Sequence, residues 1–206
     1  MRCEKSKDQS GFSMIELLVV CLVMLIVAGF AVPNFLSFIH MARLRGSASD
    51  YASLLQVARV RSVQDDTFYT TYITAGTPQQ AYVDLTKNGG TGWVSPDPAI
   101  ALSSEVNPVA AGSAPDTADL SGQFLPAGSG VVPKDASVTA KAVIFSPRGL
   151  PCTTQLAGAV CTSAGGPTAF WVFFKNNRTS AWEAVTVSPA GRIQKWQHGG
   201  SKWSKL

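Results

Sequence analysis

The pattern of hydrophobic and polar residues divides the amino-terminal part of the chain at a proline. Phe12 to Val32 form a run of 21 positions in which Glu16 is the one charged side chain. At about 1.5 Å per residue, a helix of this length reaches roughly 30 Å, which is enough to cross the hydrocarbon core of a bilayer. The sequence therefore predicts a transmembrane helix over residues 12–33. A charged side chain is costly inside a membrane, so the presence of Glu16 in this helix requires an explanation.

Beyond Pro33 the helix-favouring pattern continues but becomes amphipathic. Apolar residues recur at steps of three and four, which places them on one face of a helix: Leu44, Ala48, Tyr51, Leu55 and Ala58. We therefore expect an amphipathic helix over 34–64 that carries the rest of the chain. Pro33 has no amide hydrogen and clashes with the preceding turn, so a helix kink is expected there.

From residue 65 to 206 the pattern is that of a β-rich head. Segments with alternating or continuous β-branched and aromatic residues predict strands within 67–74, 80–86, 97–107, 137–146, 168–176 and 182–197. Residues 108–130 are rich in proline, glycine, alanine and serine, and this composition predicts a long surface loop. The whole pattern predicts an α+β fold, in which a long amino-terminal helix packs on an antiparallel sheet.

Charge is unevenly distributed along this head. The formal net charge is +4. Residues 76–135 hold an excess of acids, whereas the residues from 175 onward hold six bases against Glu183 alone. The basic tail, residues 192–206, also contains aromatic side chains. Cations neutralise phosphates and indoles stack on bases, which makes this set a candidate DNA-binding site: Arg192, Lys195, Trp196, Lys202, Trp203 and Lys205. The competing interpretation is a solvated, frayed end whose tryptophans pack on the sheet.

The sequence contains no recognisable catalytic motif. His40 and His198 are far apart in sequence, and no nucleophile elbow or phosphate-binding Walker motif occurs. We interpret His40 as a surface or subunit-contact residue of the long helix. No enzyme activity, cofactor or metal site is predicted.

The segment "GFSMIELLVV" resembles the class III signal of type IV pilins and of the related secretion pseudopilins. The resemblance implies that residues 1–11 are a leader, that a prepilin peptidase cuts after Gly11, and that it N-methylates Phe12. Glu16 then stands at the fifth mature position, where the family has its glutamate, and Pro33 stands where many members have a kinking proline. An ordinary secretory signal would have a shorter apolar region and a small-residue cleavage site.

The same resemblance implies a location and a set of partners. The chain would cross the bacterial inner membrane once, with its head in the periplasm, and later enter a pilus or pseudopilus. Its partners would be the peptidase, membrane lipid, other pilins or pseudopilins, and an inner-membrane assembly platform. Glu16 would pair with the terminal ammonium of a neighbouring subunit, as an assembly and register device. In an oxidising periplasm, Cys152 and Cys161 would form a disulfide; metal ligation by these cysteines is the alternative.

Two further segments are similar to the domain of FimT/GspH-type minor pilins and pseudopilins. Phe145, Pro147 and Gly149 match its first strand and turn, and the last strand matches at Ser188, Pro189, Gly191 and Arg192. Members of this group on the pilus side include DNA receptors used in natural transformation, which have a basic carboxyl-terminal tail after a Gly-Arg-x-Arg motif. The resemblance implies double-stranded or single-stranded DNA as a partner of this chain. In this chain Gln194 replaces the second arginine and Lys195 follows, which turns that charge to the opposite face of a strand.

Three functions remain open at this point. The first is a minor pilin that primes or caps a type IV pilus and binds DNA through its tail. The second is a GspH-like minor pseudopilin of a type II secretion system. The third is a membrane-anchored periplasmic adaptor that never enters a filament. The basic aromatic tail favours the first function over the second, and the Gly11–Phe12 site with Glu16 disfavours the third.

Overall fold

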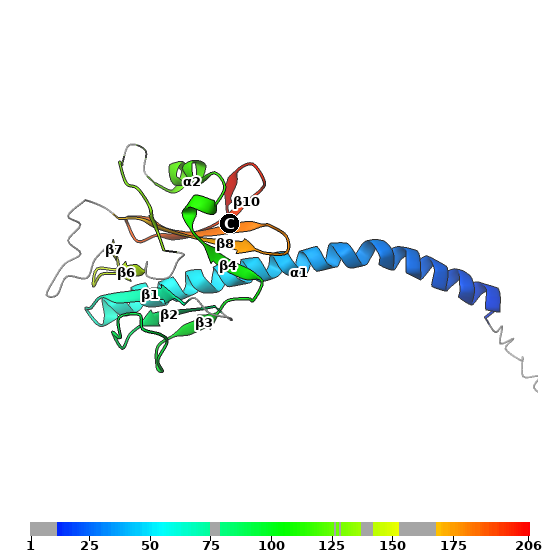
Figure 1. Cartoon of the computed structure of the whole chain (residues 1–206), viewed down its shortest axis with the longest axis horizontal. Helices are drawn as coiled ribbons and strands as arrows, with labels where there is room; N and C mark the ends of the chain where they lie inside the picture. The colour runs from blue at the N-terminus through cyan, green and yellow to red at the C-terminus, as the bar shows by residue number, and fades with distance from the viewer. Residues whose placement is uncertain (1–11, 75–78, 126, 128, 137–141, 153–167) are drawn as a thin grey trace, which may run out of the picture. The chain divides into compact units, whose positions relative to one another are not determined.

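The computed structural model describes residues 12–74, 79–125, 127, 129–136, 142–152 and 168–206 (Figure 1). The chain divides into two compact units, Met1–Ile39 and His40–Leu206. Gly11 and Cys161, both predicted site residues, lie outside the described residues.

The first unit contains the beginning of helix α1 (Met14–Gln64). The Ser13 carbonyl accepts hydrogen bonds from the N–H groups of Glu16 and Leu17 (3.0 and 3.2 Å), which starts the helix. The helix is long and apolar enough to cross a membrane, with a mean hydropathy of 2.9 in its most apolar window. The predicted apolar helix is therefore present. The backbone stays helical through Pro33, so the chain does not break there, and the kink stays a prediction.

The second unit is built around the remainder of α1. All five residues of the predicted stripe, from Leu44 to Ala58, are fully buried. They pack in one core with apolar residues of several strands, including Val143, Phe174 and Val185. The helical period that the sequence shows beyond Pro33 is therefore the period of a core-facing surface.

Two β-sheets flank this helix (Figure 1). The first has the strand order β3-β2-β1-β6-β7 and consists of β1 (Tyr69–Ile73), β2 (Gln80–Asp84), β3 (Ala99–Ala101), β6 (Val143–Phe145) and β7 (Pro151–Cys152). The second has the order β11-β10-β9-β8-β4 and consists of β4 (Val106–Val109), β8 (Phe170–Asn176), β9 (Trp182–Val187), β10 (Ile193–His198) and β11 (Trp203–Lys205). The neighbours on both paths are antiparallel, and the short strand β5 (Lys134–Asp135) adds a parallel pairing with β8. The predicted α+β class is confirmed.

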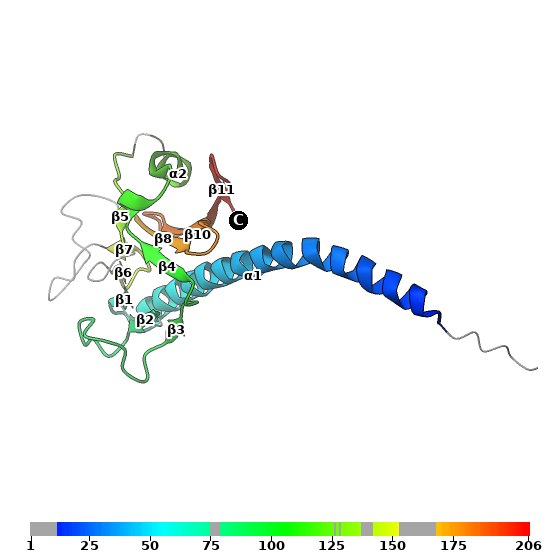
Figure 2. The ribbon, with the colours of Figure 1, turned by 45° about the vertical axis from the view of Figure 1, so that its right-hand side comes forward.

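The prediction that residues 108–130 form a long loop is wrong for much of this range. It contains the end of β4, a 3₁₀ turn η1 (Ala111–Ser113) and a helix α2 (Thr117–Phe124). Leu120 is fully buried and Phe124 is 7% exposed. Both pack on the face of the second sheet that is turned away from α1, so that the sheet lies between the two helices (Figure 2). A four-residue spacing of two large apolar side chains suffices to dock this short helix, whereas the small residues around them suggest a loop.

Candidate functional site

Among the described residues, nothing covers the apolar part of α1 in the first unit. Phe12 is 79% exposed and Leu25 74%, and the other large apolar residues from Met14 to Phe38 are at least 46% exposed. Glu16 lies in the first turn and is also exposed. Within the described residues, the side chain of Glu16 makes no hydrogen bond or ion pair. The predicted processing and assembly residues Phe12 and Glu16 are thus accessible at the start of an uncovered apolar helix.

The structure corrects the expected role of the two tail tryptophans. Trp196 is 3% exposed and Trp203 2%, in the core between the second sheet and α2. Trp196 Nε1 donates to Thr186 Oγ1 (2.9 Å), and Trp203 Nε1 donates to the Pro115 carbonyl (2.9 Å). Buried, hydrogen-bonded indoles cannot stack on bases. The competing interpretation was right that these rings pack on the sheet but wrong that the end is frayed, because β11 pairs with β10.

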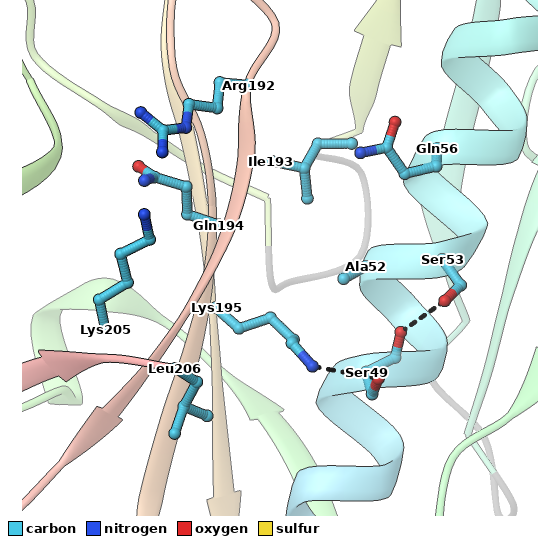
Figure 3. A pocket seen from close by; sticks show the side chains of 10 residues that line it. All are labelled: Ser49, Ala52, Ser53, Gln56, Arg192, Ile193, Gln194, Lys195, Lys205 and Leu206. Carbon is cyan, nitrogen blue, oxygen red and sulfur yellow. Dashed lines mark hydrogen bonds between the residues drawn. The ribbon is translucent and has the colours of Figure 1, made fainter.

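The cations of the tail separate into two groups. Lys202 is exposed in the turn between β10 and β11. Arg192, Lys195 and Lys205 instead line one cleft of about 280 Å³. The facing wall is α1, which contributes small or amide side chains, and Lys195 Nζ donates to Ser49 Oγ (3.2 Å) (Figure 3). The structure therefore brings three of the six predicted DNA-binding residues to one place, between a helix and a strand edge.

A buried acid, Glu183 of β9, stands close to this cleft. Its side chain is 1% exposed, and its Oε1 lies 3.7 Å from Arg45 Nε of α1. Within the described residues neither carboxylate oxygen accepts a hydrogen bond. Burial raises the pKa of Glu183 to about 7, against the opposing effect of Arg45 and Lys195. Sequence reasoning missed this residue, although it is the single acid in the basic stretch and shares one face of its strand with the core residues Val185 and Val187.

His40 is a structural residue rather than a simple surface position. Its Nδ1 lies 2.7 Å from Glu105 Oε2, and Arg43 Nη1 donates to Glu105 Oε1 (2.9 Å). The hydrogen bond with His40, together with Arg43, lowers the pKa of the Glu105 carboxyl. Asn176 Nδ2 donates to the His40 carbonyl (3.0 Å). These contacts join the first turns of the head helix to the segment before β4 and to the end of β8.

The two proline-glycine turns of the family resemblance form a matched pair. In each, the serine carbonyl accepts from the glycine N–H (2.8 Å), as Ser146 does from Gly149 and Ser188 from Gly191. Both glycines have positive φ, +70° and +76°. A Cβ on Gly191 would lie 2.5 Å from the Gly149 carbonyl oxygen, and Arg59 Nε donates to that same oxygen (3.1 Å). The turns are thus packed against each other, which locks the two sheets together at one end of α1.

The structure describes only one of the two cysteines of the predicted disulfide. Cys152 is buried on β7, and Cys161 lies outside the described residues. The pairing of the two therefore stays a prediction. Cys21, in the apolar part of α1, is a free and exposed cysteine.

Comparison with known proteins gives one match to the amino-terminal segment. Residues 6–32 match the prokaryotic N-terminal methylation motif. In this segment the chain is type IV pilin-like: the matched residues run into the long helix α1, and an antiparallel β head follows that helix. Among solved structures, the type IV minor pilin FimU of Pseudomonas aeruginosa is similar with a TM-score of 0.48 and 14% sequence identity, over 81% of this chain and 96% of that one. No curated protein matches the chain significantly.

Proposed function

We propose that the chain is a minor pilin, a low-copy subunit of a type IV filament that is made as a membrane-anchored precursor. The observation that carries the proposal is the uncovered apolar part of α1, which begins within the residues that match the methylation motif. Each Å² of apolar surface left in water costs about 25 cal/mol, so these side chains require lipid or other subunits around them. A helix that is covered by lipid before assembly and by neighbouring helices afterwards meets this requirement in both states.

The acid in this helix supports the same function. A carboxylate near the membrane edge is tolerated where it reaches the headgroups or meets a cation. After cleavage behind Gly11, Phe12 would carry a terminal ammonium, four residues from Glu16. The ammonium of one subunit and the Glu16 carboxylate of the next would then compensate each other. Pairing buried charges fixes register more reliably than it adds stability.

Mass spectrometry of the chain recovered from cells tests the proposal directly. We expect a mature protein that begins at N-methylated Phe12. Glu16→Ala should insert into the membrane normally but should not enter filaments, while Glu16→Asp keeps the charge and serves as the matched control. A mature chain that begins elsewhere, or normal incorporation of Glu16→Ala, would refute the role.

The alternative is a GspH-like pseudopilin of a type II secretion system, which would be processed and assembled into a filament in the same way. Deletion of the gene separates the two: loss of surface pili with intact protein secretion indicates a pilus subunit, and the reverse indicates a pseudopilin. A periplasmic adaptor predicts neither loss.

The cations of the tail support, as a second proposal, a role in DNA binding that is limited to contacts with phosphate groups. Arg192, Lys202 and Lys205 are exposed and available as cations, but the tryptophans are not available as stacking platforms. Any DNA affinity should therefore fall steeply with salt and show no dependence on base identity. An affinity that is indifferent to salt, or unchanged when these three cations are replaced by glutamine, would exclude this role.

A further inference from the structure

Glu183 is a buried acid on the face of β9 that is turned toward α1. Val185 and Val187 lie on the same face and belong to the core around that helix. The Glu183 side chain is 1% exposed. The residues directly opposite Glu183 are Phe174 on β8 and Gln197 on β10. Within the sheet, the direct cross-strand neighbours of this acid are therefore uncharged.

Two cations face the Glu183 carboxyl group, one from α1 and one from β10. They are Arg45 and Lys195, and both oppose the effect of burial on its pKa. The residue opposite Glu183 on β8, Phe174, contacts the titratable ring of Tyr51 from α1 (5.4 Å between ring centroids). Burial raises the pKa of Tyr51, so this phenol stays neutral near pH 7. Arg45 and Lys195 are therefore the groups that can respond to a charge on Glu183.

Both cations are hydrogen-bonded to uncharged acceptors. Arg45 Nη2 donates to Gln197 Oε1 (2.9 Å), although Arg45 Nε lies 3.7 Å from Glu183 Oε1. Lys195 Nζ donates to Ser49 Oγ (3.2 Å) (Figure 3). In the part of the chain that the structure describes, neither oxygen of the Glu183 carboxyl group accepts a hydrogen bond. A carboxylate is a stronger acceptor for a cation than an amide or a hydroxyl, so this arrangement fits a carboxyl group that retains its proton.

Loss of this proton changes the preferred partner of Arg45. The O–H bond of the Glu183 carboxyl group breaks, the proton passes to water, and the electron pair stays on the carboxylate. Arg45 Nε then has to approach by about 0.8 Å to reach an ordinary hydrogen-bond distance of about 2.9 Å. The Arg45 side chain is 52% exposed, so its guanidinium can move without displacing a core side chain. The approach is favoured because a buried carboxylate without a partner is costly.

We propose that Glu183, Arg45 and Gln197 form a proton-controlled switch between α1 and the second sheet. With Glu183 protonated, Arg45 joins α1 to β10 through the Gln197 amide. With Glu183 ionised, Arg45 leaves Gln197 and joins α1 to β9 through the carboxylate. The proton thus decides which strand binds this part of the helix. The switch acts within the head, so its failure would leave the proposed filament role unaffected.

The switch should operate near neutral pH. Burial raises the pKa of Glu183 from the ordinary 4.5 to about 7. The carboxyl group is therefore mostly protonated at about pH 6 and mostly ionised at about pH 8. A carboxyl group with the ordinary pKa would be ionised at both.

Nuclear magnetic resonance of the full chain in detergent micelles tests the switch. The signals to follow, from about pH 4 to about pH 9, are the side-chain carboxyl carbon of Glu183 and the side-chain amide of Gln197. We expect both to change with one midpoint near pH 7. Glu183→Gln identifies the first signal and should keep the Gln197 amide at its low-pH position throughout. A Glu183 midpoint near 4.5, or a Gln197 amide that does not follow it, would overturn the proposal.

Two variants separate the switch from the simple burial of an acid. Arg45→Gln removes the cation and should raise the Glu183 midpoint by about one pH unit or more. Gln197→Ala removes the competing acceptor, so Arg45 is free to bind the carboxylate, and the midpoint should fall by about half a unit, a threefold loss of proton affinity. Gln194→Ala is the matched control, because Gln194 lies on the opposite face of the same strand, and it should leave the midpoint unchanged. A midpoint that Gln197→Ala does not lower would contradict the exchange of partners.

The same titration distinguishes Arg45 from the other cation. If Lys195→Gln raises the Glu183 midpoint more than Arg45→Gln does, Lys195 is the responding group and the proposed switch is wrong. Glu105→Gln removes an acid that binds a different arginine of α1, and it should leave the titration of Glu183 as in the parent. If Arg45→Gln fails to fold, Gln197→Ala decides the question, since it changes no charge.

Discussion

At the residue scale, Glu183 makes the stability of the head depend on pH. Burial raises its pKa from the ordinary 4.5 to about 7, so the folded state retains a proton that the unfolded chain releases. The contribution of Glu183 to stability is therefore most favourable at or below pH 4.5, and it falls as pH rises toward 7, by up to about 3 kcal/mol. Glu183→Gln should remove that slope and stabilise the head at pH 8, as measured by urea unfolding across this range.

Glu105 provides the control for that prediction because its pKa is lowered rather than raised. Its contribution is present above the ordinary value and is lost as pH falls below it. Glu105→Gln should therefore weaken the head at neutral pH and leave the slope between pH 4.5 and 7 in place. If Glu183→Gln retains the parent's slope, the buried acid is not its source.

The pair of proline-glycine turns predicts a second residue-scale effect. Gly191→Ala would place a Cβ 2.5 Å from the Gly149 carbonyl oxygen at a φ of +76°, so both a clash and an unfavourable backbone conformation oppose it. We expect a loss of about 2–4 kcal/mol. Gly200 also has positive φ but nothing within 4 Å, so Gly200→Ala should cost about 1 kcal/mol. Equal losses for the two variants, in thermal or urea unfolding, would show that the turns are not packed as described.

At the element scale, α2 depends on two buried side chains. Leu120→Ala should cost about 2–4 kcal/mol, since Leu120 is fully buried against the second sheet. This loss of unfolding free energy should be measurable by following the fluorescence of the tryptophans in the same core during urea unfolding. Gly122 lies on this helix with open space around it, so Gly122→Ala should raise stability by up to about 1 kcal/mol. If Leu120→Ala leaves the free energy of unfolding unchanged, the packing of α2 on the second sheet does not stabilise this core.

This helix also shows where sequence reasoning ends. The stripe from Leu44 to Ala58 was predictable because five positions repeat over four turns, and each is buried. In α2 only Leu120 and Phe124 carry the signal, within residues whose composition favours a loop. The strands around 168–176 and 182–197 were predictable from continuous β-branched and aromatic residues. β11 was not, because three residues after a glycine turn show no period, and their pairing comes from β10.

The candidate sites follow the same rule. Local motifs identify Gly11, Phe12 and Glu16, since the signal lies in the order of neighbouring residues. The cleft joins α1 to residues about 140 positions later, and Glu183 meets Arg45 across a similar interval. No local pattern records such contacts. The prediction for the two tail tryptophans was wrong for the same reason. A tryptophan next to a lysine gives the same local sequence pattern whether its indole is buried or exposed.

At the scale of the whole molecule, the division at Ile39 and His40 predicts a head that folds alone. Every buried residue of the described chain lies at Leu44 or beyond, so a fragment of residues 40–206 retains both cores. We expect it to be soluble and to unfold cooperatively without detergent. A fragment of residues 44–206 keeps the same buried residues but lacks His40 and Arg43, the two groups bound to Glu105. Its melting temperature should be lower, and the difference should shrink below the pKa of Glu105, where the carboxylate is protonated and the ion pair is lost in both fragments. A fragment of residues 40–206 that needs detergent to stay folded would show instead that the apolar helix is part of the head's own core.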